Sequence, residues 1–194
     1  MQKLLCTLST VLLGAGIVPA ASWQIDSAHS AAHFSVRHMM VSNVRGEFSG
    51  VRGTVDYDPA NPTLATVDVT IDATTVNTRE PKRDAHLKTA DFLEVGKHPT
   101  ITFRSKKVEP AGAGRLKVTG DLTLRGVTKQ VVLDVEGPSA EVSQGGRSRV
   151  GATATTKINR KDFGVNYNRT IDAGGVVVGD EVTITLDIEM IKRT

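Results

Sequence analysis

The chain of 194 residues carries 24 basic and 21 acidic residues, which gives a formal net charge of +3 with both signs interspersed. Aromatic residues make up only 4% of the sequence. Nucleic-acid-binding proteins need clustered basic charge, and those that bind single strands also need aromatic side chains for base stacking. We therefore expect no nucleic acid among the partners of this protein.

Residues 1–20 have the organisation of a secretory signal peptide. Lys3 supplies a basic start, an apolar run follows from Leu4 to Val18, and small residues precede a cleavage point after Ala20. Cleavage there removes Cys6, the one cysteine of the sequence, and leaves a domain at 21–194 without disulfides. No later segment is long and apolar enough to span a membrane. We expect a soluble product beyond the inner membrane.

The first segment after this peptide, DSAHSAAHFSVRHMM (26–40), looks like a metal site. It contains three of the five histidines, namely His29, His33 and His38. Alternation from Ala32 onward predicts a strand with Phe34, Val36 and His38 on its inner face and His33 on the other. One continuous strand cannot bring all three histidines to one ion. We therefore expect no metal site, and a histidine-based metalloenzyme is the weaker alternative.

Alternation of apolar and polar residues continues along most of the chain. In NVRGEFSGVRGTVDYD (43–58) the parity switches at Ser49–Gly50, which predicts one long strand with a bulge or a strong bend. Further antiparallel strands with one exposed face are predicted at 66–72, 100–108, 115–126, 129–137, 150–158 and 182–190. About eight such strands without a second domain predict a closed barrel, because closure removes unpaired edges.

One segment, TREPKRDAHLKTADFLEVGKHP (78–99), has no alternation. Thr78 can cap a helix, and Pro81 suits the first helical turn. We expect a short helical insertion at about residues 79–93.

The interior of an eight-stranded barrel is either filled by side chains or able to hold one small ligand. Several residues at inward parity are small: Gly46, Ser105, Gly120, Ala152, Ala154 and Thr156. Because few aromatic residues are present to compensate, these positions favour an apolar cavity. A fully packed barrel that acts through its surface is the alternative.

The sequence offers little for catalysis. No cysteine follows the signal peptide, and no G-x-S-x-G nucleophile elbow or phosphate-binding glycine loop is present. Asp84 and His86 in RDAH could form an acid–base pair, but no nucleophile accompanies them. We expect a protein that is not an enzyme and that has no cofactor.

Five segments together resemble the YceI-like polyisoprenoid-binding periplasmic proteins. They are IDSAHSAAHFSVRHM, VRGEFSGVRGTVDYD, RDAHLKTADFLEVGKHPTITF, GDLTLRGVTKQVVLDV and INRKDFGV, and the resemblance extends from about Trp23 to Ile191. It implies an all-β, lipocalin-like, extended eight-stranded antiparallel barrel. It also implies periplasmic binding, transport or storage of a polyprenyl lipid, an isoprenoid quinone or a fatty amide. His33 departs from the family pattern.

The resemblance also implies a set of ligand-binding residues, which are Phe34, Val36, His38, Phe48, Arg83, Asp84, His86, Leu87, Phe92, Phe103 and Phe163. Among them, His38 or Arg83 with Asp84 is our hypothesis for the contact with a polar head group. A quinone-holding partner of a membrane cytochrome is an alternative function. The sequence leaves open a homodimer and a transient contact with the inner membrane or such a cytochrome.

Overall fold

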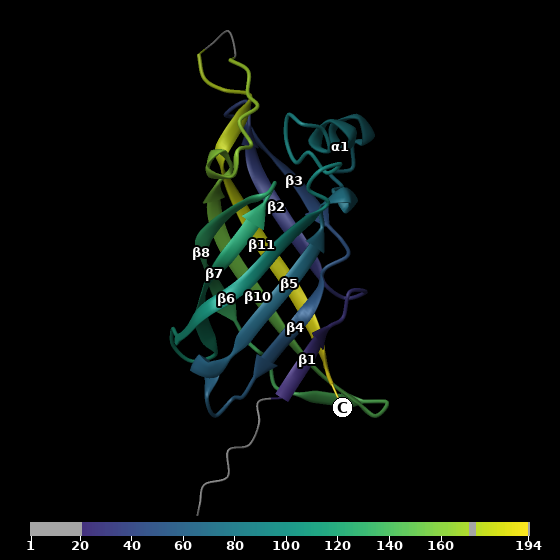
Figure 1. Ribbon diagram of the computed structural model, residues 1–194, viewed down its shortest axis with the longest axis vertical. Coiled ribbons are helices and arrows are strands. Elements are labelled where there is room, and N and C mark those ends of the chain that lie inside the picture. Colours follow the sequence, from purple (N-terminus) through teal and green to yellow (C-terminus); the bar gives the residue numbers. More distant parts are fainter. Residues whose placement is uncertain (1–20, 171–173, 194) are drawn as a thin grey trace, which may run out of the picture.

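The structure is a computed structural model that describes residues 21–170 and 174–193 (Figure 1). The predicted signal peptide lies outside the described residues. The strands within them are β1 (Ala21–Ile25), β2 (Ala31–His38), β3 (Ser42–Phe48), β4 (Arg52–Tyr57), β5 (Thr66–Asp72), β6 (Thr100–Pro110), β7 (Arg115–Leu124), β8 (Val127–Glu136), β9 (Val142–Gln144), β10 (Arg147–Asn159) and β11 (Val178–Lys192). The helical segments are η1 (Pro62–Leu64), η2 (Ala73–Thr75), α1 (Pro81–Leu87) and η3 (Arg160–Phe163).

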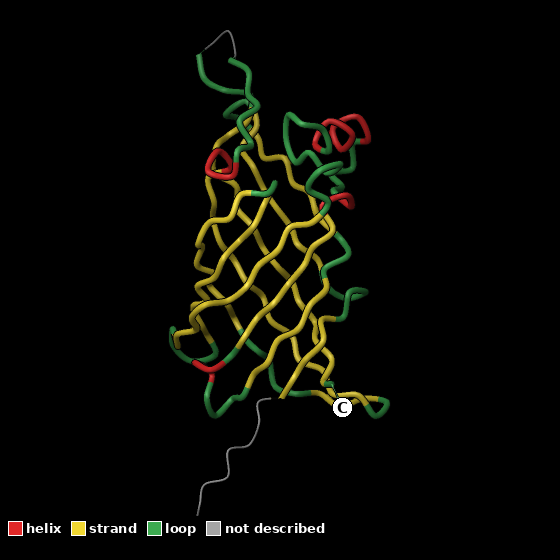
Figure 2. Tube along the Cα trace, viewed as in Figure 1, coloured by secondary structure: helices red, strands yellow, loops and turns green. Residues whose placement is uncertain are grey.

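The strands form one antiparallel sheet that closes on itself as an eight-stranded barrel. The circuit runs β11-β1-β4-β5-β6-β7-β8-β10 and returns to β11 through a long ladder that includes Ala154↔Leu186 and Ile158↔Val182. Figures 1 and 2 show the strands tilted around an elongated barrel. The predicted fold class is therefore confirmed.

Two positions of the barrel are each occupied by a strand in two pieces. β1 and β2 both pair with β11, and β3 pairs with β2 while β4 pairs with β1. The break between β3 and β4 falls at Ser49–Gly50, where Gly50 has a φ of 68°. The predicted bend is thus in the right place, but it ends one strand and begins another. β1 itself was not predicted, because five residues are too few for alternation to stand out.

The helical insertion is shorter than predicted. α1 has seven residues, and its N-cap is Glu80, whose carboxylate accepts a hydrogen bond from the Lys82 amide. Thr78 is not the cap: its hydroxyl donates to Asp84 Oδ1 over 2.5 Å. The first helical residue is Pro81, whose fixed φ suits that position. Among the described residues, no helix combines the length and the apolar character that crossing a membrane requires.

Two of the small inward residues do not leave empty space. A Cβ added to Gly46 would lie 2.4 Å from Cζ of Phe34, and one added to Gly120 would lie 2.5 Å from Cζ of Phe103. Each phenyl ring therefore occupies the space over a glycine on the neighbouring strand, a known way to compensate for glycine in a sheet. Ser105 lies at a bulge in β6, where its Oγ accepts from the Val67 amide. The expectation that these three positions supply cavity volume was wrong.

The two ends of the barrel differ in what covers them. α1 and the segment that follows η3 lie at the upper end in Figure 1, whereas β1 and the C-terminus lie at the lower end. The turn between β2 and β3 also belongs to the upper end, because the Met39 amide donates to the Val177 carbonyl just before β11. This upper end collects most of the non-strand structure and is the region in which polar groups meet the barrel interior.

Candidate ligand-binding cavity

A cavity of about 440 Å³ occupies the barrel interior. Every strand of the closed barrel contributes to its wall, and most of the lining side chains are apolar. Representative wall residues are Ile25, Val55, Val69, Ile101, Val118, Leu133, Ala154 and Leu186. Ala152, Ala154 and Thr156 line it as the sequence predicted, and their small side chains leave room opposite the larger ones. The barrel is therefore not fully packed.

Nine of the eleven residues predicted for the ligand site line this cavity. They are Phe34, Val36, His38, Phe48, Arg83, His86, Leu87, Phe92 and Phe103. They come from β2, β3, β6, α1 and the turn after α1, so the barrel brings together residues far apart in sequence. The two others, Asp84 and Phe163, do not line it. Phe163 is buried in the hydrophobic core with 2% of its surface exposed.

Arg83 and Asp84 converge on a residue of the protein itself. Thr78 is buried, its amide and hydroxyl both donate to Asp84 Oδ1, and Arg83 Nε donates to the Thr78 hydroxyl over 2.7 Å. A second Arg83 nitrogen donates to the Thr78 carbonyl over 2.9 Å. These hydrogen bonds fix the start of α1 against the chain that precedes it. Asp84 therefore has a structural position, and Arg83 reaches the cavity as part of the same network.

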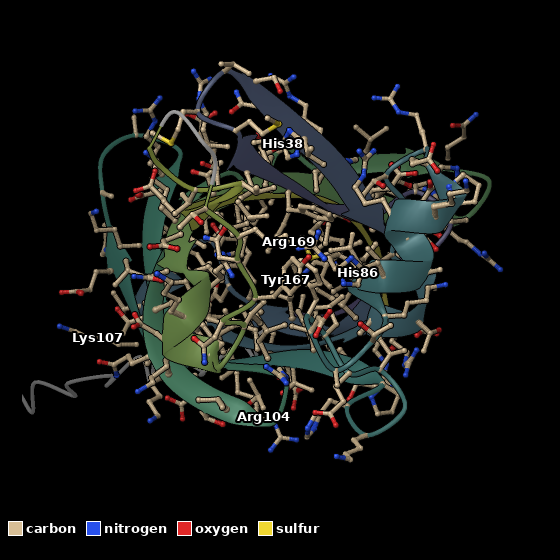
Figure 3. All side chains as sticks on the ribbon, turned by 90° about the horizontal axis from the view of Figure 1, so that it is seen from above. His38, His86, Arg104, Lys107, Tyr167 and Arg169 are labelled. Carbon is tan, nitrogen blue, oxygen red and sulfur yellow. The ribbon has the colours of Figure 1, made fainter. Side chains whose placement is uncertain are left out.

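His86 lies in an aromatic cluster at the upper end of the cavity. Its ring meets Phe92 and Tyr167 edge-on, with centroids 5.0 Å and 4.9 Å away, and Phe92 lies 5.0 Å from Tyr167. His86 Nε2 lies 2.7 Å from Asp91 Oδ2, and the guanidinium of Arg169 stands 5.9 Å from the Tyr167 ring centre. Figure 3 looks down on this end and shows Tyr167 and His86 side by side over the barrel interior.

Arg160 holds the segment that carries Tyr167. Its side chain is buried, and it donates to the carbonyls of Val165 and Tyr167 over 2.6 and 2.9 Å. It also donates to Gly179 and lies 3.3 Å from Asp180 Oδ1. Burial lowers the pKa of Arg160, and the Asp180 charge opposes that change. The hydrogen bonds compensate for removing this guanidinium from water.

Arg125 links the same segment to the turn that follows α1. It lies in the tight turn between β7 and β8, with a φ of 50°, and Gly126 follows with a φ of 73°. Its guanidinium donates to the carbonyls of Gly164 and Ala90, the second over 2.6 Å. Glu94 lies 3.6 Å from the same group. Three segments distant in sequence are thus tied together above the cavity.

The three histidines of 26–40 have separate surroundings. His33 lies on the outer face between Glu47 and Asp187, at 3.8 and 3.5 Å. His38 ends β2 and lines the cavity. His29 lies between β1 and β2 and contacts Asp26 Oδ2 at 2.9 Å.

His29, Asp26 and Glu189 lie close enough together to hold a metal ion, but the guanidinium of Arg149 already binds the two carboxylates. Arg149 donates to both carboxylates, over 2.7 Å to Asp26. The hydrogen bond from Arg149, with a smaller contribution from His29, lowers the pKa of Asp26 to about 2. The Arg149 cation thus neutralises the carboxylates that a metal ion would need.

Sequence patterns do not identify Arg160, Val165 and Tyr167, which also line the cavity. They follow β10, where alternation stops, so parity carries no information about them. The motif INRKDFGV contains Arg160 and Val165, but the family resemblance implies only Phe163 from it as a ligand-binding residue. A buried arginine cannot be recognised from its neighbours in sequence, because its acceptors are carbonyls of a later loop and strand.

Comparison with known proteins agrees with this architecture. A sequence profile of the YceI-like domain matches residues 23–190. The protein YceI of Escherichia coli O157:H7 is 35% identical over 189 residues, which cover 96% of this chain and 95% of that protein. This chain belongs to the YceI family.

Solved structures of similar proteins share the barrel. The YceI protein of Campylobacter jejuni superposes with a TM-score of 0.70 and 33% identity, over 81% of this chain and 90% of that one. A polyisoprenoid-binding domain from Saccharophagus degradans gives a TM-score of 0.61 at 17% identity, over 90% of this chain and 99% of that domain. The second likeness shows a common fold. The barrel described above is therefore an architecture that these proteins share.

Proposed function

We propose that this YceI protein binds a long isoprenoid-like amphiphile inside its barrel, without catalysing a reaction. The observation that carries the proposal is the apolar cavity of about 440 Å³, whose wall comes from every strand of the barrel. This volume lies in the usual range for ligand sites, about 300–1,000 Å³. The polyisoprenoid-binding domain of Saccharophagus degradans has the same fold, which supports this ligand class.

The distribution of polar groups orients the ligand. His38, Arg83, His86 and Tyr167 all reach the cavity at the upper end, whereas Val135, Ile188 and Met190 line it toward the lower end. Charged and imidazole side chains for a polar head group therefore gather at the upper end, and the tail extends down the barrel past a mainly apolar wall. Burying 200 Å² of apolar tail contributes about 5 kcal/mol before binding entropy is subtracted.

The predicted signal peptide adds a location to this proposal. Export with cleavage after Ala20 places the barrel in the periplasm, where it transports or stores a lipid that is insoluble in water. Residues 21–194 form the binding domain in this reading.

A mass spectrum of lipids extracted from the gently purified protein tests the proposal. We expect a stoichiometric polyprenyl lipid, isoprenoid quinone or fatty amide. Ala154→Phe places a phenyl ring inside the barrel and should reduce the bound lipid at least about tenfold. Thr155→Phe, one residue later on the outer face, is the matched control and should leave it unchanged. The proposal would be refuted if folded wild-type protein neither co-purified with an isoprenoid nor bound one that was added.

A further inference from the structure

The turn between β2 and β3 exposes three consecutive apolar side chains. Met39, Met40 and Val41, here called the hairpin tip, have 43%, 56% and 76% of their surface exposed. Elsewhere among the described residues the large exposed apolar side chains stand singly, as Leu64 does at the lower end. A single exposed apolar residue needs no explanation, but a contiguous group marks an interaction site.

The hairpin tip is held in a defined conformation. Met39 and Met40 have φ values of 47° and 62°, a region that residues with side chains rarely adopt. The Met39 amide donates to Val177 over 2.8 Å, and Arg37 donates to the Met40 carbonyl over 2.9 Å. These hydrogen bonds hold the turn in a conformation in which the three apolar side chains are exposed to solvent.

Positive charge flanks the hairpin tip: Arg45 is exposed on the outer face of the barrel, and Arg37 is exposed and also borders the cavity. Arg37 lies opposite Asn43, and Arg45 lies opposite Ser35, so the two exposed arginines are diagonal neighbours on adjacent strands. Neither has a carboxylate within 4 Å among the described residues, whereas Glu47 farther along β3 is near His33 at 3.8 Å. An apolar tip with two cations behind it complements an anionic bilayer, whose negative head groups lie above an apolar layer.

The same hairpin also forms part of the cavity wall. Val36, His38 and Val44 line the cavity from β2 and β3, immediately below the hairpin tip. In Figure 3 His38 lies on this side of the upper end, across from Tyr167 and His86. The apolar surface of the tip and the apolar lining of the barrel therefore belong to one continuous β-hairpin.

We propose that the hairpin tip docks the protein onto an anionic lipid bilayer, with Met39, Met40 and Val41 in the interfacial layer and Arg37 and Arg45 at lipid phosphates. This inference rests on the proposed function, since it places the polar end of the cavity at the membrane surface. An amphiphile can then pass between bilayer and barrel with little exposure of its tail to water. The partner is the lipid surface itself, without a protein receptor.

Co-sedimentation with vesicles tests the docking. The purified protein is mixed with vesicles of phosphatidylcholine alone or with phosphatidylglycerol added as the anionic lipid. Met40→Ser/Val41→Ser should lower binding to the anionic vesicles at least about tenfold, and Leu64→Ser, the matched exposed residue at the other end, should not. Val41→Asp provides a second variant at the most exposed position, should the double variant fold poorly.

Charge is tested with Arg45→Gln. We expect about a fivefold loss on anionic vesicles, because one arginine near such a surface contributes about 1 kcal/mol, and no change on neutral ones. Arg147→Gln, an exposed arginine next to β9, is the control and should have no effect. The proposal would be overturned if the hairpin-tip variants bound anionic vesicles as tightly as the wild type does. So would a dimer in vesicle-free sedimentation that Val41→Asp dissociates while vesicle binding persists.

A second measurement separates this inference from the proposed function. Binding of geranylgeraniol in vesicle-free solution reports the cavity alone, and we expect the hairpin-tip variants to match the wild type. If the wild type binds vesicles through the tip but never binds geranylgeraniol or another isoprenoid, the proposed function fails and docking remains. If geranylgeraniol binds but no variant changes vesicle association, the docking proposal fails and lipid binding remains.

Discussion

The imidazole of His86 meets the ring of Tyr167 edge-on, with centroids 4.9 Å apart and planes at 84°. His86 belongs to α1, and Tyr167 to the segment after η3, 81 residues later in the sequence. Their contact lies over the polar end of the cavity, together with Phe92. Under the proposed function, a long ligand that enters at this end has to separate these rings, so we expect the contact to slow ligand exchange.

Tyr167→Ala should speed ligand exchange. An aromatic contact of this kind contributes about 0.5–1.5 kcal/mol, which corresponds to about a two- to tenfold faster release of a fluorescent isoprenoid alcohol in stopped-flow displacement. Tyr57→Ala is the control, because Tyr57 lines the cavity from β4 near the lower end. Equal acceleration by both variants would show that lost wall area, and not the contact with His86, sets the rate.

Gly120→Ala should destabilise the barrel by about 1–3 kcal/mol. The new Cβ would lie 2.4 Å from the Arg104 carbonyl oxygen and 2.5 Å from Phe103 Cζ, so backbone and ring must both move. Gly96→Ala is the matched control, since a Cβ there meets nothing within 4 Å. Urea unfolding measures both variants. A Gly120→Ala protein as stable as the Gly96→Ala protein would mean that the Phe103 ring does not fill this space.

Asp26 should make stability depend on acid pH. Its folded pKa, about 2, is below its ordinary value of 3.8, mainly because Arg149 hydrogen bonds to its charged form. The folded state therefore gains on the order of 1–2 kcal/mol from this carboxylate above about pH 4, and loses it as the pH falls toward 2. Urea unfolding at several pH values should show this loss.

The matched variants are Asp26→Asn and Asp162→Asn. Asp26→Asn should be less stable than the wild type at pH 7 and should lose less stability between pH 4 and pH 2. Asp162 is exposed and has no basic group within 4 Å among the described residues, so its variant should follow the wild type. If the wild type and the Asp26→Asn protein lost the same free energy of unfolding between pH 4 and pH 2, Asp26 would not be the source of the acid dependence.

Arg160→Met should destabilise the protein by about 3 kcal/mol or more, because carbonyls that now accept from a buried cation would lose their partner. Lys161→Met is the neighbouring control: Lys161 is exposed and pairs with Asp180 at 2.8 Å, so its loss should cost less than about 1 kcal/mol. Thermal unfolding gives the comparison. If the two variants were equally stable, the buried hydrogen bonds of Arg160 would not be what organises this loop.

Sequence reasoning located most of the barrel because alternation is a local property. Each long strand has one face toward the cavity or core and one toward water, so period two is visible without knowledge of its neighbours. The exceptions follow the same logic. β1 is too short to show a period, and α1 begins at Pro81 because Glu80, and not Thr78, caps it.

The tertiary structure decided which of the predicted site residues reach the cavity. Parity places Phe34, Val36 and His38 correctly, since all three lie on one strand. It cannot show that Asp84 is held by Thr78, because that hydrogen bond depends on how the chain folds back on α1. Nor can it show that the Phe103 ring covers Gly120 from the next strand. The volume expected from the small residues alone was therefore too large.

By itself the sequence determined most of the strands, the closed barrel and the apolar character of its interior, because these follow from periodicity and from the need to leave no strand edge unpaired. Only the tertiary structure decided how the upper end is built. The contacts of His86, Arg125, Arg160 and Tyr167 join segments far apart in the chain, and the exposed hairpin tip acquires its position from pairing with β11. Such contacts depend on distances between strands that no local pattern encodes.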